Sequence, residues 1–478
     1  TGSNVNLLGL KIRRGTNTNA GVGGVAEMLW LENTVYNWTI EECFIDGNMT
    51  GQIARLGYYY TEIACKGEIA TKPQVITVRN NYFTDTGSRA TDLRCIRDLI
   101  ISGNIFRDCG VNIPGGNKGT CVEVQSYDAT NTLRPSYNVT ITGNVFQRFG
   151  DGAINCGGTY DLVISNNVVE GASVFNVEPL GIEENAISII GGERISIVGN
   201  TCTKVRSGGV QVRTQIVTGT VLKPIQSVVV ANNVLTGGVT PTGAICETSL
   251  QVQGLNATLY VRNVSVIGNT LDNTSISINS AVNCPVDGVV VSGNTIRGVA
   301  TTGANYGVYV SDNGTNITGV VISANRITNC ARAIYAPTVL PADTQVVAND
   351  YGNCPIGLSD PVTPALLLGP DLKYPGITTM PAKTQSIAAF GPVTYDATVK
   401  LVSGSGGPVE SSSTGPTGAT TSGQIIYIIG TSDTNTVEFK QSASLHLGAN
   451  RVLGNGDVLT LIYVLGFGWV ELAFSNNV

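Results

Sequence analysis

The residues of this chain that could do chemistry are mainly carboxylates. The sequence has 478 residues but a single histidine, His446, near its C-terminal end. Catalysis by Ser-His-Asp or Cys-His groups is therefore excluded from the rest of the chain, as is a histidine-based zinc site. Acid–base chemistry would fall to Asp and Glu, with Tyr, Lys or Arg as the other proton donors and acceptors.

Two of these carboxylates occupy matching positions in the sequence. Asp151 in GDGAIN and Glu184 in EENAIS precede similar short apolar runs. If these runs are adjacent parallel strands, about 4.8 Å apart, the two carboxylates stack about 5 Å from each other. Retaining glycosidases separate their acid and nucleophile by ~5–5.5 Å, and inverting enzymes separate acid and base by ~6.5–9.5 Å. Glu183 is the alternative at the second position, and Glu123 would form a wider, inverting pair with Asp151.

Polar residues continue along the same predicted strands. Four of them, Glu123, Asn155, Ser188 and Gln211, each stand between two residues expected to point inward, as in Val122-Glu123-Val124. Since successive side chains of a strand face opposite sides, these four form an outward polar column. Nearby aromatic and cationic residues are expected to stack on sugar rings and to hold acidic substituents. These predicted substrate contacts are Tyr127, Tyr137, Tyr160, Arg206 and Arg213.

Loops are expected to wall this column on both edges and so make a groove. The predicted loops are residues 111–118 and 173–182 on one edge, and 128–136, 214–224 and 248–258 on the other. Asp92, Glu247 and Asp312 also fall on predicted strands, so they stay open as alternative catalytic carboxylates.

The strands that would position these residues belong to a repeat. A phrase of the form apolar-x-Gly/Asn-Asn-x-apolar recurs with spacings of 23, 40, 23, 33, 33, 36, 25 and 31 residues. Such a period indicates a solenoid, and apolar residues at spacing two indicate strands. The prediction is an all-β, right-handed parallel β-helix with three strands per coil. The repeat Asn residues are Asn81, Asn104, Asn144, Asn167, Asn200, Asn233, Asn269, Asn294 and Asn325.

The repeat also predicts the interior of the helix. The second residue after each Asn is apolar, from Phe83 to Ile327, and the fifth is small or apolar, as at Cys109 and Cys330. Both positions are expected to line a narrow buried lumen. Each Asn is expected at a corner, with a left-handed φ and with its amide stacked on the Asn of the next coil.

Composition excludes several other functions. The net charge is −6 and no basic cluster is present, so we expect no nucleic-acid partner. No apolar run approaches the ~20 residues that cross a bilayer, so membrane insertion is not expected. The eleven cysteines include no CxxC pair. We interpret them as buried reduced thiols, and this predicts folding in a reducing cytoplasm. No metal and no cofactor are expected.

The composition and the strand pattern of the sequence change after the repeat. We predict a β-helix over residues 1–362, a Pro-rich linker over 363–375 and a small antiparallel β-sandwich over 376–478. The last unit is expected to serve trimerisation or carbohydrate binding, with Trp469 as a candidate for sugar stacking. Because the pattern is already under way at VNLLGLKI, a preceding segment is expected to have been removed.

The order of these features resembles a known family. A β-helix with NxF corners, followed by GTSDTNTVEF, LGANRVLGNGDVLTLIYV and GWVELAF, resembles the tailspike depolymerases of phages that infect capsulated Gram-negative bacteria. The resemblance implies a homotrimer in the phage tail, attached through a missing N-terminal part, that cleaves capsular or other surface polysaccharide outside the host cell.

Three functions are therefore open. The first is an endo-acting glycoside hydrolase with paired carboxylates. The second is a polysaccharide lyase, which would need a uronic acid substrate, a Lys, Arg or Tyr base and a neutralising cation or Arg. The third is a glycan-binding adhesin or spike without catalysis.

Overall fold

A computed structural model gives the fold of most of the chain. It describes residues 4–14, 25–30, 36–48, 59–66, 74–86, 89–109, 119–126, 135–150, 152–171, 185–205, 208–214, 216–217, 220–221, 224–237, 250–255, 259–280, 284–298, 305–312, 316–337, 340, 343–354, 356–359, 367–368, 382–395, 399–418 and 424–476. None of these residues lies in a helix, so they include no helix able to span a membrane. They divide into two compact units, Thr1–Ile377 and Thr378–Val478.

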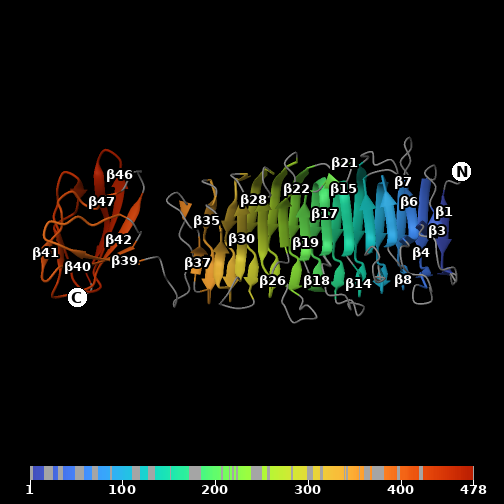
Figure 1. The fold of residues 1–478 in the computed structure, drawn as a ribbon, viewed down its shortest axis with the longest axis horizontal. Helices are drawn as coiled ribbons and strands as arrows, with labels where there is room; N and C mark the ends of the chain where they lie inside the picture. The colour runs from blue at the N-terminus through green and yellow to red at the C-terminus, as the bar shows by residue number, and fades with distance from the viewer. Residues whose placement is uncertain are drawn as a thin grey trace. The chain divides into compact units, whose positions relative to one another are not determined.

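The first unit is built from coils of three parallel strands that pile into three stacks (Figure 1). The expected parallel β-helix is therefore confirmed. The first stack leads up to each repeat Asn: β1 (Val5–Leu8), β4 (Tyr36–Glu41), β7 (Gln74–Arg79), β10 (Arg97–Ser102), β13 (Ser136–Thr142), the second halves of β15 (Gly152–Ser165) and β17 (Asn185–Val198), β22 (Ile225–Ala231), β25 (Val261–Ile267), β28 (Val286–Ser292), β31 (Ile317–Thr318), β32 (Val321–Ser323), β35 (Gln345–Val347) and β38 (Leu367–Leu368).

The other two stacks complete each coil. The second stack follows the Asn and holds twelve short strands: β2 (Lys11–Arg13), β5 (Phe44–Asp46), β8 (Tyr82–Thr84), β11 (Ile105–Arg107), β14 (Val145–Gln147), β16 (Val168–Glu170), β18 (Thr201–Val205), β23 (Val234–Gly237), β26 (Thr270–Asp272), β29 (Thr295–Arg297), β33 (Arg326–Thr328) and β36 (Asp350–Gly352). The third stack comes next: β3 (Val25–Trp30), β6 (Tyr59–Lys66), β9 (Arg89–Arg94), β12 (Thr120–Gln125), the first halves of β15 and β17, β19 (Gly208–Arg213), β24 (Leu250–Gly254), β27 (Ile276–Ser280), β30 (Tyr306–Asp312), β34 (Arg332–Tyr335) and β37 (Ile356–Ser359).

The repeat Asn residues form a hydrogen-bonded ladder between coils. From Asn81 to Asn325, each donates its backbone N–H and its side-chain Nδ2 to Oδ1 of the next, with distances of 2.9–3.1 Å, and Asn349 is the last member among the described residues. Nδ2 also donates to a backbone carbonyl of the preceding coil, such as Ile164 O for Asn200. One amide therefore joins three consecutive coils while it is almost fully buried.

The left-handed backbone lies one residue earlier than the sequence predicted. Positive φ angles belong to the residue before the ladder Asn, as at Gly103 (φ 65°), Asn166 (φ 54°) and Gly199 (φ 70°). This explains the Gly/Asn preference at that position, since these types tolerate the left-handed region best. The ladder position itself is Asn because its amide supplies both donors and an acceptor to neighbouring coils.

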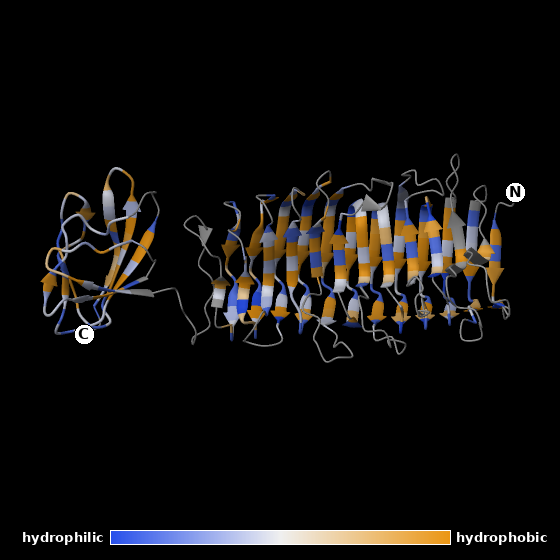
Figure 2. Cartoon of the chain, in the orientation of Figure 1, coloured by the Kyte–Doolittle hydropathy of each residue, from blue (hydrophilic) through white to orange (hydrophobic). Residues whose placement is uncertain are grey.

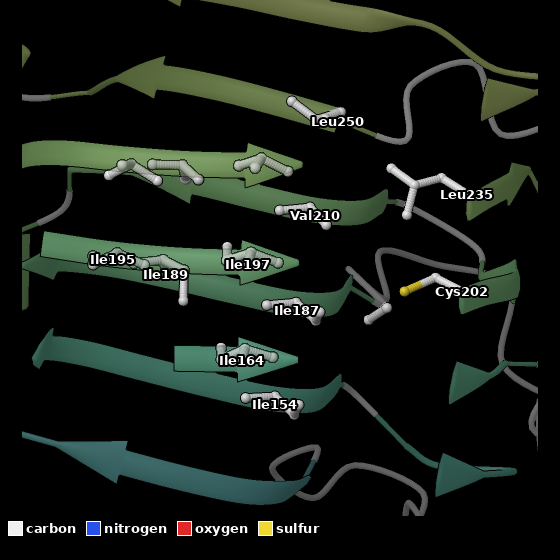
Figure 3. Close-up of a cluster of buried hydrophobic side chains, with 14 of the residues drawn as sticks. Ile154, Ile164, Ile187, Ile189, Ile195, Ile197, Cys202, Val210, Leu235 and Leu250 are labelled. Carbon is white, nitrogen blue, oxygen red and sulfur yellow. The ribbon is translucent and has the colours of Figure 1, made fainter. Parts of the chain in front are cut away.

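The lumen is filled by stacked apolar side chains, as predicted. Figure 2 shows apolar and polar bands alternating along the strands. In Figure 3, Ile154, Ile187, Val210 and Leu250 come from successive coils and point to the same side. Phe83, Phe106 and Phe146 stack with ring centroids 4.7 and 4.9 Å apart. Nine cysteines in the described part of the chain are free, and all nine are buried.

The second unit contains two sheets. One orders β39 (Ala382–Ile387), β40 (Val399–Gly404), β42 (Ile425–Gly430), β46 (Val458–Val464), β47 (Gly468–Ser475) and β44 (Leu445–His446); the other orders β41 (Val409–Glu410), β43 (Val437–Phe439) and β45 (Arg451–Leu453). The predicted antiparallel pairing holds for β42–β46–β47, but β39–β40–β42 pair in parallel.

Two details of the predicted boundary and of the second unit are corrected. β38 lies within the predicted linker 363–375 yet pairs with β35, so the strand pairing of the helix continues into that segment. Trp469 was expected to be available for sugar stacking, but it is 1% exposed, and its indole N–H donates to Pro416 O at 2.6 Å. Its ring packs against Tyr395 and Tyr463, so it belongs to the core of this unit.

We expect Asn200→Ala to destabilise the helix by about 3 kcal/mol, because it leaves Ile164 O and two donors of Asn167 buried without their partner. Asn232→Gly is the control, since Asn232 has a φ of 54° at a position where neighbouring coils carry Gly. We expect it to change stability by less than about 1 kcal/mol. Denaturant unfolding of both variants measures the difference, and equal midpoints would contradict a structural role for the ladder.

Candidate functional site

The outward face of the third stack carries one continuous column of side chains. Each member is the Cα partner of the next across parallel strands, which lie about 4.8 Å apart. The four residues predicted as a polar column belong to it, and the column extends beyond them in both directions. In order it contains Asp92, Glu123, Asn155, Ser188, Gln211, Gln251, Ser277, Tyr309 and Tyr335.

Two carboxylates, Asp92 on β9 and Glu123 on β12, are adjacent members of this column. Both face away from the lumen, yet Asp92 is only 1% and Glu123 only 4% exposed. Arg94 binds Asp92 with two hydrogen bonds of 2.8 Å, from Nε and Nη2. Arg89 bridges the pair, because its Nη1 lies 3.0 Å from Asp92 Oδ2 and its Nε contacts Glu123 Oε2. A single guanidinium therefore holds both carboxylates close together.

The two carboxylates sit in different electrostatic environments. Burial raises the pKa of Glu123, and the negative charge of Asp92 raises it further, while Arg89 and the hydrogen bond from Gln125 oppose the shift. Gln125 Nε2 donates to Glu123 Oε1 at 2.8 Å. Asp92, in contrast, is held by ion pairs from two guanidinium groups, Arg89 and Arg94. In glycosidases, the acid and base roles fall to neighbouring carboxyl groups whose surroundings differ.

Beyond Glu123 the column offers polar atoms that no described residue satisfies. Asn155 Oδ1 and Ser188 Oγ are buried and have no hydrogen-bond partner in the described part of the structure. Ser188 is 8% exposed. Gln211 differs, because its Nε2 donates to Gln251 Oε1 at 2.9 Å and its Oε1 accepts from Asn185 Nδ2 at 3.3 Å. Since an unsatisfied buried oxygen costs free energy, Asn155 and Ser188 are the positions where a bound hydroxyl or amide would be most favourable.

Paired glycines shape the corner beside these residues. β15 and β17 each pass from the third stack into the first without a break, at Gly157-Gly158 and Gly191-Gly192. Gly158, Gly191 and Gly192 have φ angles of 63°, 71° and 139°, which side-chain-bearing residues rarely adopt. Gly157 also leaves room for Gln125, because a Cβ there would lie 2.4 Å from Gln125 Oε1.

The predicted aromatic and cationic contacts lie on both sides of this corner, some in the third stack and some in the first. Arg213 lies two residues beyond Gln211 on β19 and therefore on the same strand face. Tyr137 and Tyr160 lie across the corner in the first stack, with their rings stacked at 5.1 Å. Tyr160 is 5% exposed, and burial followed by the charge of Glu193 raises its pKa.

Several predictions fall outside the described residues. They are Asp151, Glu183, Glu184, Arg206, Tyr127, the alternative Glu247 and the loops 111–118 and 173–182. Gly152 and Asn185, the described residues that follow Asp151 and Glu184 in the sequence, are Cα partners on adjacent coils.

Other predictions are placed differently by the structure. The predicted loop 248–258 contains strand β24, which pairs with β19 and β27. Within 214–224, β20 (Ile216–Val217) and β21 (Thr220–Val221) form an antiparallel pair. Asp312 accepts the backbone N–H groups of Asn316 and Ile317, which is the role of a turn-forming residue.

Sequence reasoning left Asp92 as an alternative and missed its two arginines. The signal was present in the sequence. In RATDLR, Asp92 stands between two inward residues, as Glu123 does in CVEVQ of the next coil, and Arg94 stands at the position of Gln125. For metals, the described residues contain no group of three or more His, Cys, Asp or Glu side chains able to hold an ion.

Comparison with known proteins gives no family assignment by sequence. No protein-family profile matches the chain. An alpha-1,3-galactosidase A from Bacteroides fragilis is 24% identical over 146 residues, which are 28% of this chain. The match spans 24% of the length of that relative, so the chain covers about a quarter of the curated relatives it matches.

Solved structures similar to this chain include tailspikes and polysaccharide-degrading enzymes. The tailspike of E. coli bacteriophage HK620 has a TM-score of 0.45 at 11% identity, covering 99% of this chain and 80% of that one. PfbA, a surface adhesin of Streptococcus pneumoniae, has 0.47 at 13% identity, covering 73% and 85%. An endo-xylogalacturonan hydrolase from Aspergillus tubingensis has 0.41 at 12%, covering 76% and 91%.

The raised pKa of Glu123 predicts an unusual pH dependence of stability. The folded protein keeps this proton at pH values where the unfolded chain has lost it, so unfolding becomes easier as pH rises through that interval. Glu123→Gln removes this effect. The variant should therefore gain stability relative to the parent protein as pH rises from below the ordinary glutamate pKa to above the raised pKa.

Glu170→Gln is the matched control, because the pKa of Glu170 is shifted in the opposite direction and the stability of this variant should change with pH in the opposite sense. A hydrogen bond from Lys204 lowers the pKa of Glu170, so its carboxylate stabilises the fold above the ordinary pKa, and this contribution is lost as pH falls through the lowered pKa. Glu170→Gln should lose stability relative to the parent at neutral pH. Denaturant unfolding between about pH 4 and pH 8 compares the two variants, and the same sign for both would be inconsistent with a buried, proton-retaining Glu123.

Proposed function

We propose that this chain is a phage tailspike depolymerase, an endo-acting glycoside hydrolase that cleaves bacterial capsular or other surface polysaccharide. The observation that carries the proposal is the buried pair Asp92 and Glu123 on the outward face of the third stack. One member has a raised pKa, and the other is bound by two arginines. Hydrolysis of a glycosidic bond needs such a pair, one carboxyl protonated and one ionised.

In this proposal Glu123 is the general acid that donates its proton to the glycosidic oxygen. Asp92 is the carboxylate that attacks the anomeric carbon or, at a wider separation of the two carboxyl groups in the protein, the base that activates a water molecule. Asn155, Ser188, Gln211 and Arg213 follow Glu123 along the stack and bind neighbouring sugar units. The unsatisfied oxygens of Asn155 and Ser188 would accept sugar hydroxyl groups there.

Asp151, Glu183 and Glu184, which lie outside the described residues, remain proposed catalytic partners. Gly152 and Asn185 are Cα partners at the start of β15 and β17, and β15 pairs with β12, the strand that carries Glu123. This adjacency supports a site in which Glu123 pairs with Asp151 instead of Asp92. Arg206, Tyr127, Tyr137 and Tyr160 stay proposed substrate contacts.

Lyase action is the alternative chemistry. It would need a base and a cationic group free to neutralise a uronic acid. Arg89 and Arg94 are both bound to carboxylates, which favours hydrolysis. The two reactions differ in product, because elimination leaves an unsaturated, ultraviolet-absorbing chain end and hydrolysis leaves none.

A glycan-binding spike without catalysis is the second candidate function. The observation that favours it is the engagement of Asp92 by two guanidinium groups, an arrangement that also serves as a purely structural ion-pair network. Under either function we propose a homotrimer carried on the phage tail, folded in the bacterial cytoplasm and acting at the outside of the host cell.

We expect Glu123→Gln and Asp92→Asn to slow polysaccharide shortening by at least about 100-fold, because each removes one member of the acid–base pair. Asp151→Asn and Glu184→Gln test the alternative pair in the same assay. Glu170→Gln, a carboxylate of the second stack paired with Lys204, should retain full activity. Size distribution and ultraviolet absorbance of purified capsular polysaccharides, before and after incubation, provide the measurement.

The outcomes separate the candidate functions. Shortening without new absorbance supports a hydrolase, whereas shortening with new absorbance identifies a lyase. Full activity of both Glu123→Gln and Asp92→Asn, with folding verified by unfolding midpoints, would move the catalytic role to Asp151 and Glu184. If the parent protein binds polymers but shortens none of them, the spike function stands and the catalytic assignments fall.

A further inference from the structure

The column that carries the candidate site becomes aromatic toward the C-terminal end of the β-helix. After Ser277, its next members are Tyr309 on β30 and Tyr335 on β34. Tyr306 joins them, because its ring centroid lies 4.4 Å from that of Tyr335 and 5.4 Å from that of Tyr309. The three rings form one cluster on two adjacent coils, and all three are partly exposed.

An arginine completes this cluster. Arg332 is the Cα partner of Tyr306, and its guanidinium lies 4.5 Å from the ring centroid of Tyr335 and 5.8 Å from that of Tyr306. Its Nε is buried and has no hydrogen-bond partner among the described residues. A cation is thus held against two aromatic rings with one donor unused, although an arginine ordinarily uses its donors.

The core of the helix does not require these tyrosines. The lumen at this level is filled by Val308, Val310 and Ile334, all 0% exposed, and Tyr309 and Tyr335 alternate with them along the strands and so point to the opposite face. Tyr309 and Tyr335 are therefore outward, and the ring of Tyr306 stacks on both. Partly exposed aromatic rings beside an arginine are typical of surfaces that bind sugars with acidic groups, because rings pack on the apolar faces of sugars and a guanidinium binds carboxylates.

We propose that Tyr306, Tyr309, Tyr335 and Arg332, the Tyr–Arg platform, form a second carbohydrate-binding site that holds a distant stretch of an acidic polysaccharide. This inference rests on the proposed function of the column. Tyr309 follows Ser188 by four strand spacings and Glu123 by six, which correspond to about 19 Å and about 29 Å along the helix axis. One extended chain lying along the column would therefore contact the candidate site and the platform together.

Binding measurements with matched polymers test this proposal. The probes are immobilised capsular polysaccharides of Gram-negative bacteria that contain uronic acids, each in its native form and in a carboxyl-reduced form with the same linkages. Tyr335→Ala should weaken binding to both forms about tenfold, because a ring-stacking surface is lost. Arg332→Gln should weaken binding to the native form about tenfold and leave the carboxyl-reduced form unchanged.

Tyr260→Ala is the matched control. Tyr260 also packs beside an arginine, with the Arg262 guanidinium 4.3 Å from its ring centroid, but it lies at the start of the first stack. We expect this variant to bind every polymer as the parent protein does. Glu123→Gln should bind fully while losing chain shortening, so the platform and the catalytic site are measured separately.

Several results would overturn the proposal. Unchanged affinity of both Tyr335→Ala and Arg332→Gln for a polymer that the parent protein binds would show that the platform makes no contact with it. A change of oligomeric state in Tyr335→Ala, seen by sedimentation, would assign the cluster to an interface between copies of this chain. Failure of the parent protein to bind any of the polymers would overturn the platform together with the proposed function. Binding that is sensitive to Arg332→Gln, without chain shortening, would support the platform and remove the hydrolase.

Discussion

The structure of the first unit depends on the ladder of buried asparagine amides. Each amide donates to the carbonyl of the coil before it and to the amide oxygen of the coil after it, so three coils are tied at a single point. This fixes where every strand begins relative to its neighbours. Since a slip of one residue would exchange the inward and outward faces of a strand, the ladder also fixes which side chains fill the lumen and which form the outward column.

A fixed register is favourable for some side chains and unfavourable for others. Phenylalanine rings and amides gain from identical neighbours at one strand spacing, and the lumen and the ladder are built in this way. Carboxylates at the same spacing repel each other, so Asp92 and Glu123 can be adjacent only with compensation. Arg89 and Arg94 supply ion pairs, and burial together with the charge of Asp92 raises the pKa of Glu123 and so favours its neutral form. The chemistry proposed for this pair depends on these compensating contacts and on that burial.

The repeat in the sequence was sufficient to predict the coils, the lumen residues and the outward column, because each is set by a local pattern of period two. It could not resolve which of two adjacent residues takes the left-handed φ, since the ladder Asn and the preceding Gly or Asn both tolerate it. Trp469 was misplaced because the alternation in GWVELAF does not say which face is covered. The link between Arg89 and Glu123 was missed for another reason. It joins residues of different coils with opposite charge, and no repeated feature marks such a contact.

The ladder also has a direction. From Asn81 to Asn325, the backbone N–H and one Nδ2 proton of each ladder residue point to the coil that comes later in the sequence, and none of these bonds runs the other way. A coil that has just emerged during synthesis therefore holds donors whose acceptor has not yet been made. Within the described residues the last member of the series is Asn349, whose Oδ1 accepts from Asn325 Nδ2 and whose Nδ2 donates to Ile322 O. Until the next coil has been translated, the ladder donors of the newest coil have no Oδ1 to bind.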